Sequence, residues 1–104
     1  MNTLLRTGPN SVRCEAFEVW ESGDYEMTYR DSEGREIRVP IEFVLPPFLK
    51  TGESVYTRVR MNFLTGWKPP HDKDPFTAGD YRMLKERLTA AFDELMPNKY
   101  RFEE

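Results

Sequence analysis

The period of the hydrophobic pattern changes once along the chain, and this change limits the fold more than any other feature. Before residue 65, apolar and polar residues alternate in several short runs, which is the period of a strand with one buried face. Over 77–95, apolar residues recur at the spacing of a helix that buries one stripe. We therefore expect an α+β fold, in which an antiparallel β-meander of about four strands packs against one C-terminal α-helix.

The strands of this meander are expected over four segments: 11–20, 25–30, 37–43 and 54–64. The alternation of the first segment slips between Cys14 and Phe17, which predicts a bulge or a change of buried face. Gly34 lies just before the third segment and suits a hairpin turn with positive φ. Pro40 lies inside the third segment and has no N–H to donate, so this strand is expected to be an edge strand or to break there. An unpaired edge at this strand leaves room for homodimerisation.

Other segments are expected to be irregular. Two prolines interrupt the apolar segment 44–49, which predicts a connection, and the segment 65–75 is typical of a surface loop. The residues 4–5 suit either a short strand or an ordered arm. The residues 99–102 suit either a short terminal strand or a tail.

The C-terminal helix has clear signals at both ends. Thr77 is a favourable N-cap, and Asp80 follows three residues later in the arrangement of a capping box. Pro97 is expected to end the helix. The predicted buried stripe consists of Tyr81, Leu84, Leu88, Ala91, Phe92 and Leu95.

The length and composition favour one small domain spanning 1–104. A chain of 104 residues is long enough for one domain and too short for two. Apolar residues make up only 38% of it. Because an aromatic side chain buries about 150–250 Å², the 7 Phe, 5 Tyr and 2 Trp are expected to supply much of the core.

The charge balance and the absence of targeting signals narrow the class of protein. The formal net charge is -3, which argues against a protein that binds duplex nucleic acid by bulk positive charge. No apolar run is long enough for a transmembrane helix, and the first residues do not have the pattern of a signal peptide. A single cysteine excludes an internal disulfide framework. We expect a cytoplasmic protein with no membrane partner.

The sequence gives little support to catalysis. His71, Asp72 and Asp74 form the only cluster of histidine and carboxylates, but a zinc site needs three or four ligands, so a charged surface loop is the favoured interpretation. Cys14 has only one histidine in the whole chain as a partner and is expected to be a small buried hydrophobic residue. No glycine-rich phosphate loop or nucleophile elbow is present. We expect no catalytic residue, no cofactor and no bound metal.

The distribution of charge indicates a protein partner. The segment 15–26 contains five carboxylates and no Lys or Arg, and aromatic residues flank its turn. Acidic rims with aromatic anchors suit a basic partner; the alternative is a solubilising hairpin whose aromatic side chains point into the core, and the two are weighed about evenly. A tryptophan beside two prolines is a second rigid contact, although for this residue a place between helix and sheet is favoured. The predicted partner-binding residues are Glu18, Trp20, Glu21, Asp24, Tyr25, Glu26 and Trp67.

A basic aromatic strip suggests a different partner. Tyr56, Arg58 and Arg60 alternate along one face of a predicted strand and suit contact with RNA, single-stranded DNA or a phosphate. The favoured interpretation is a solvated outer face, because a net positive field and a second aromatic residue at binding spacing are missing.

Three segments together resemble small immunity proteins of bacterial polymorphic toxin systems. They are the strand Gly34-Arg35-Glu36-Ile37-Arg38-Val39-Pro40-Ile41, the motif Trp67-Lys68-Pro69-Pro70, and the capped helix from Thr77 to Leu95. The resemblance implies a cytoplasmic, non-catalytic inhibitor that binds one cognate toxin, and it assigns no binding residue. The alternatives are a small nucleic-acid-binding or regulatory module and a phage-encoded inhibitor of a host enzyme.

Overall fold

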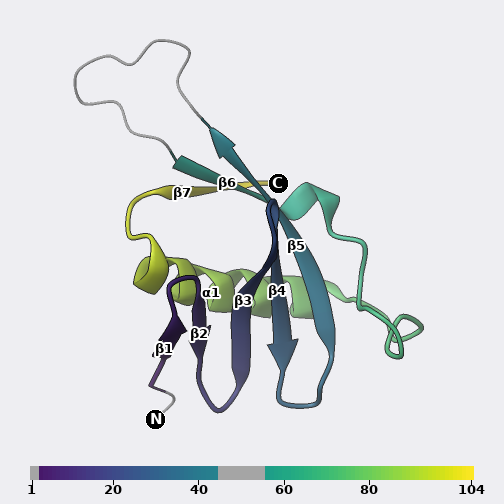
Figure 1. Cartoon of the computed structure of the whole chain (residues 1–104). Helices are drawn as coiled ribbons and strands as arrows, with labels where there is room; N and C mark the ends of the chain where they lie inside the picture. The colour runs from purple at the N-terminus through teal and green to yellow at the C-terminus, as the bar shows by residue number, and fades with distance from the viewer. Residues whose placement is uncertain (1–2, 45–55) are drawn as a thin grey trace, which may run out of the picture.

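The computed structural model describes residues 3–44 and 56–104, which form one mixed sheet and one long helix (Figure 1). The seven strands lie in the sheet in their order along the chain, and every neighbouring pair is antiparallel except the last, β6 and β7, which are parallel. The elements are β1 (Leu5–Gly8), β2 (Ser11–Arg13), β3 (Phe17–Gly23), β4 (Glu26–Asp31), β5 (Glu36–Val44), β6 (Tyr56–Arg60), the 3-10 helix η1 (Met61–Phe63), α1 (Ala78–Leu95) and β7 (Tyr100–Glu103).

The predicted α+β class with one C-terminal helix is confirmed, but the expected four strands understate the seven that form. The predicted strand 11–20 is two strands, because the N–H of Cys14 donates to the carbonyl of Phe17 (2.9 Å) and turns the chain back. The two ends of the chain supply β1 and β7. The connection expected over 44–49 lies outside the described residues beyond Val44.

The structure fits the second alternative predicted for Pro40 better than the first: β5 is not an edge strand, but its pairing changes at this residue. β5 pairs with β4 along its first half and with β6 along its second half. The N–H of Ile41 donates to the carbonyl of Tyr25 on the β4 side (3.0 Å), so the nitrogen of Pro40 faces the β6 side. The pairing of Ile41 with Val59 puts Arg60 opposite Pro40, which is where β6 ends and η1 begins. The missing N–H of Pro40 thus ends the ladder between β5 and β6 and leaves the ladder between β5 and β4 intact.

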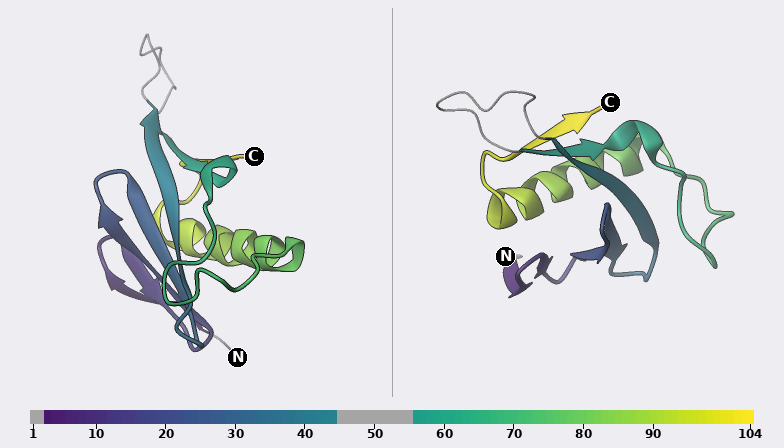
Figure 2. Two further views of the ribbon diagram at one scale, coloured as in Figure 1. Left: turned by 90° about the vertical axis from the view of Figure 1, so that its right-hand side faces the viewer. Right: turned by 45° about the horizontal axis from the view of Figure 1, so that its top comes forward.

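This change of partner along β5 bends the sheet around the helix. Figure 2 shows β1–β4 on one side of α1 and β6–β7 on another, with β5 running between the two parts. The predicted strand 54–64 is correspondingly short in the described residues, since Met61 already belongs to η1.

The core lies between the concave face of the sheet and α1. It is mostly aliphatic, and only four of its buried residues are aromatic: Phe17, Tyr29, Trp67 and Phe92. Four more aromatic residues are partly buried and pack against this core: Phe76, Tyr81, Tyr100 and Phe102. More than half of the aromatic side chains in the described residues therefore contribute to the core, as expected. The remaining aromatic residues of the described chain are half-buried or exposed: Trp20, Tyr25, Phe43, Tyr56 and Phe63.

The helix follows its predicted signals closely. Thr77 Oγ1 accepts from the N–H of Asp80 (3.1 Å), and Asp80 Oδ2 accepts from the N–H of Thr77 (3.0 Å), so the predicted capping box is confirmed. The fully buried part of the stripe consists of Leu84, Leu88, Ala91 and Phe92. Within residues 3–44 and 56–104, no helix has the length and apolarity needed to cross a membrane.

Candidate protein-binding surface

The tip of the β3–β4 hairpin presents two side chains to solvent. Gly23 pairs with Glu26, so Asp24 and Tyr25 form the two-residue turn between them. The Tyr25 side chain is 67% exposed. Its backbone is nevertheless held in place, since its carbonyl accepts the bond from Ile41 that joins the tip to β5. The turn thus offers an exposed aromatic ring on an anchored backbone.

A second aromatic ring lies against the first. Phe43 is 48% exposed, and its ring centroid lies 6.4 Å from that of Tyr25 with the planes tilted by 55°. The left view in Figure 2 shows β5 extending beyond the end of the hairpin, and Phe43 lies on this extension, past the last residue paired with β4. Phe43 continues the alternation of apolar residues along β5, and at Ile41 the apolar side chain of this alternation is buried. Only the tertiary arrangement shows that this position remains exposed.

Two of the predicted acidic contact residues are already paired within the sheet. Glu18 forms a salt bridge with Arg30, the residue opposite it on β4. Glu26 lies 3.5 Å from the guanidinium of Arg38 on β5 and accepts a hydrogen bond from Ser22 (2.6 Å). Strand pairing therefore neutralises part of the acidic character that the local sequence predicts.

The other two predicted acidic contact residues, Glu21 and Asp24, differ in whether their carboxylates have partners. Glu21 accepts a hydrogen bond from the side-chain amide of Asn10 (3.1 Å). The carboxylate of Asp24 is exposed, and within the part of the chain that the structure describes it has no hydrogen-bond or salt-bridge partner. Asp24 is therefore the predicted acidic contact residue whose charge is most open to a partner.

Trp20 lies on the outer face of the sheet and is half-buried. It pairs across the strands with Thr28, and the guanidinium of Arg30 lies 5.2 Å from the centroid of its ring. The indole is thus neither in the core nor fully open to solvent. It belongs to the side of the hairpin rather than to its tip.

Trp67 is a core residue, and its predicted role in partner binding has to be corrected. It is only 4% exposed and packs edge-on against Phe76 with a centroid distance of 5.3 Å. The guanidinium of Arg35 covers its ring at 4.5 Å and is itself held by Asp31 (2.8 Å). The interpretation favoured for this residue, a buried place between helix and sheet, agrees with its position in the core. A partner cannot reach the indole without opening this cluster.

The predicted nucleic-acid strip comes together on β6, but its charges are occupied. Arg60 contacts Glu42 at 2.7 Å and Glu103 at 3.1 Å, and Arg58 contacts the same two carboxylates at 3.7 and 3.0 Å. The guanidinium of Arg101 covers the ring of Tyr56 at 4.5 Å. The charges of Arg58 and Arg60 are therefore balanced by two glutamates, which disfavours contact of these two arginines with phosphates.

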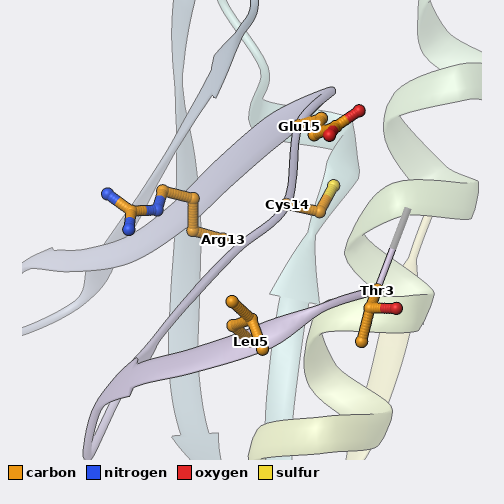
Figure 3. A pocket seen from close by; sticks show the side chains of 5 residues that line it. All are labelled: Thr3, Leu5, Arg13, Cys14 and Glu15. Carbon is orange, nitrogen blue, oxygen red and sulfur yellow. The ribbon is translucent and has the colours of Figure 1, made fainter. Parts of the chain in front are cut away.

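The remaining candidate residues do not form a reactive cluster. His71 Nδ1 lies 3.3 Å from Asp74 Oδ2, and among the described residues no group of three or more His, Cys, Asp or Glu is placed to hold a metal ion. Cys14 is half-buried rather than buried and lines a surface pocket of about 370 Å³. Figure 3 shows the guanidinium of Arg13 pointing away from its thiol.

Comparison with known proteins gives no match: neither a protein-family model, nor a curated protein, nor a solved structure is significantly similar to the chain. The resemblance to small immunity proteins therefore stays a prediction.

Proposed function

We propose that this chain is a non-catalytic protein-binding module whose main contact is the aromatic tip, defined as Asp24, Tyr25 and Phe43. The observation that carries the proposal is the contact between two exposed aromatic rings on anchored backbone. Tyrosine is enriched among the residues that dominate binding energy in protein interfaces. A ring already held by a hydrogen-bonded backbone and a neighbouring ring also loses little conformational freedom on binding.

The partner that suits this surface is a protein with a basic patch. The carboxylate of Asp24 adjoins Tyr25 in the turn, and a charge at the rim of an aromatic anchor guides association and fixes orientation. Interfaces of ordinary size bury about 800 Å² on each partner, so the aromatic tip would be the centre and the flanking faces of β3 and β5 the rim.

The most concrete form of the proposal is a toxin-neutralising immunity protein that masks a cognate effector in the cytoplasm. Its support is the resemblance of the strand 34–41, the motif 67–70 and the helix to such proteins, together with the suitability of an acidic aromatic tip for a basic effector. In this role the chain acts by occupying a surface of the effector and needs no chemistry of its own.

The test is co-expression with the product of each adjacent gene. We expect one product to inhibit growth when expressed alone, and we expect this chain to restore growth and to co-purify with it in a defined ratio. Tyr25→Ala is expected to weaken both rescue and co-purification. Phe63→Ala is the matched control, since Phe63 is also an exposed aromatic residue (53%) but lies on η1. If no adjacent product gives rescue or a complex, the immunity proposal is wrong.

A further inference from the structure

Aromatic rings of this protein, both in the core and at the surface, are repeatedly covered by its own cations. Among residues 3–44 and 56–104, six rings have a guanidinium or ammonium group 4.3–5.5 Å from the centroid. The pairs are Arg30 on Trp20, Arg35 on Trp67, Arg60 on Phe63, Lys85 on Phe102, Arg87 on Phe17 and Arg101 on Tyr56. The negative face of an aromatic ring attracts a cation, and arginine, the cation in five of these pairs, also stacks as a plane.

The aromatic tip departs from this pattern. Three aromatic side chains of the described residues are strongly exposed: Tyr25, Phe43 and Phe63. Phe63 has Arg60 over its ring at 4.3 Å. Neither ring of the tip has a Lys or Arg over it among the residues that the structure describes. The two exposed rings therefore contact each other while lacking the cation that the third one has.

The chemistry beside these rings is suited to such a cation. Asp24 precedes Tyr25 in the turn, and its carboxylate has no partner among the described residues. Arginine can stack on an aromatic ring and donate two parallel hydrogen bonds to a carboxylate at the same time. A compact ammonium group offers only a point charge, and an aliphatic side chain would leave the carboxylate without a partner.

We propose that the aromatic tip is a receptor for an arginine side chain of the partner protein, whose guanidinium stacks on the Tyr25–Phe43 pair and pairs with the carboxylate of Asp24. This inference rests on the proposed protein-binding function and names the group that the surface recognises. The partner supplies across the interface the contact that Arg60 supplies to Phe63 within the chain.

The test uses a short blocked peptide, Gly-Arg-Gly, and the same peptide with citrulline in place of arginine. Citrulline keeps the planar shape and removes the charge. With the intact protein labelled with ¹⁵N, we expect millimolar arginine peptide to shift the amide signals of residues 23–26 and 41–43 in a saturable way. The citrulline peptide is expected to shift them much less. Equal shifts with both peptides would assign the tip to an uncharged side chain and overturn the inference, as would the absence of selective shifts with the arginine peptide.

Variants locate the contact. Tyr25→Ala is expected to weaken arginine-peptide binding about two- to five-fold, the range of an exposed cation–π contact. Asp24→Asn is also expected to weaken binding of the arginine peptide. The loss should be larger in low salt than in high salt, because salt screens the attraction between exposed charges. Phe63→Ala is the matched control and should leave peptide affinity unchanged, because the ring of Phe63 already has its cation. A loss of affinity in Phe63→Ala equal to that in Tyr25→Ala would contradict a specific receptor at the tip.

The two proposals fail in different ways. If Tyr25→Ala abolishes the complex with the effector while arginine and citrulline peptides behave alike, the protein-binding function stands and arginine recognition is wrong. If the arginine peptide binds selectively at the tip but no adjacent gene product forms a complex, the immunity role is wrong and the receptor for arginine stands.

Discussion

The aromatic tip and the strip on β6 contain similar residues but differ in what surrounds them. Each combines aromatic rings with charged side chains, and each was a candidate binding surface. On β6 the charges are matched by Glu42 and Glu103, and Arg101 covers the ring of Tyr56. At the tip, no Lys or Arg of the described residues covers either ring. The proposed binding surface thus differs from the strip in the contacts that the described chain leaves open, and not in residue type alone.

The largest expected effect follows from removing both rings of the tip. Tyr25→Ala combined with Phe43→Ala is expected to weaken the complex with the effector by about 2–4 kcal/mol, the range of a dominant interface residue. The free energy of unfolding is expected to change by only about 0.5 kcal/mol, because both side chains are exposed. Calorimetric titration and urea denaturation measure the two quantities. A large loss of stability would show that the rings are structural and would remove the contrast with β6.

On β6 we expect the opposite result, a loss of stability without a loss of binding. Arg60→Ala removes contacts with Glu42 and Glu103 and the cation over Phe63, so the free energy of unfolding is expected to fall by about 1–2 kcal/mol. Binding to the effector should not change. Urea denaturation provides the measurement, and Arg82→Ala, at an exposed position on α1, is the control. Equal stability of the two variants would mean that the cluster contributes nothing measurable.

Removing the two carboxylates of the strip on β6 is expected to make its arginines available to phosphates. Glu42→Gln combined with Glu103→Gln frees Arg58 and Arg60 from their carboxylates. We expect the variant, but not the natural chain, to bind a single-stranded oligonucleotide in low salt. Its affinity should fall with about the 0.7 power of the salt concentration for each phosphate contacted. Fluorescence anisotropy across a salt series measures this. Binding by the natural chain would contradict the view that its arginines are occupied.

The local features of the fold were predictable because their causes lie close together in the sequence. Thr77 and Asp80 cap the same helical turn, and their spacing alone predicts the capping box. Gly34 adopts the predicted positive φ of 85°. The alternation over 25–30 likewise predicts β4 to within one residue.

The features that the sequence did not predict depend on partners far along the chain. The acidic hairpin is partly neutral because Arg30 and Arg38 lie on neighbouring strands. The arginines of the strip on β6 are paired in part with Glu103, which lies on β7, after the helix in the sequence. Pro40 proved compatible with a central strand because its missing N–H faces the side where a ladder ends. Of the aromatic tip, Asp24 and Tyr25 were predicted, whereas the exposure of Phe43 required the relative lengths of β4 and β5.

The smallest expected effect concerns pH and the half of the sheet that contains β7. Burial, together with the hydrogen bond that Tyr100 Oη donates to Asp93 (2.6 Å), raises the pKa of Tyr100 to about 12. In the unfolded chain this pKa is about 10, so the folded state holds the proton more tightly. The resulting stabilisation is complete below about pH 10 and is lost as the pH rises toward the folded value.

Between pH 10 and pH 11, the contribution of Tyr100 to the free energy of unfolding is therefore expected to fall by about 1 kcal/mol or less. Urea denaturation of the natural chain and of Tyr100→Phe over this range measures it, and the difference in stability between the two should shrink as the pH rises. Asp93→Asn keeps Tyr100 and removes the negative charge of the group that accepts its hydrogen bond, so its slope should lie between the other two. If stability changes equally with pH in the natural chain and in Tyr100→Phe, folding does not raise the pKa of Tyr100. The loss of stability would then have to arise elsewhere, since burial also raises the pKa values of Tyr29 and Tyr81.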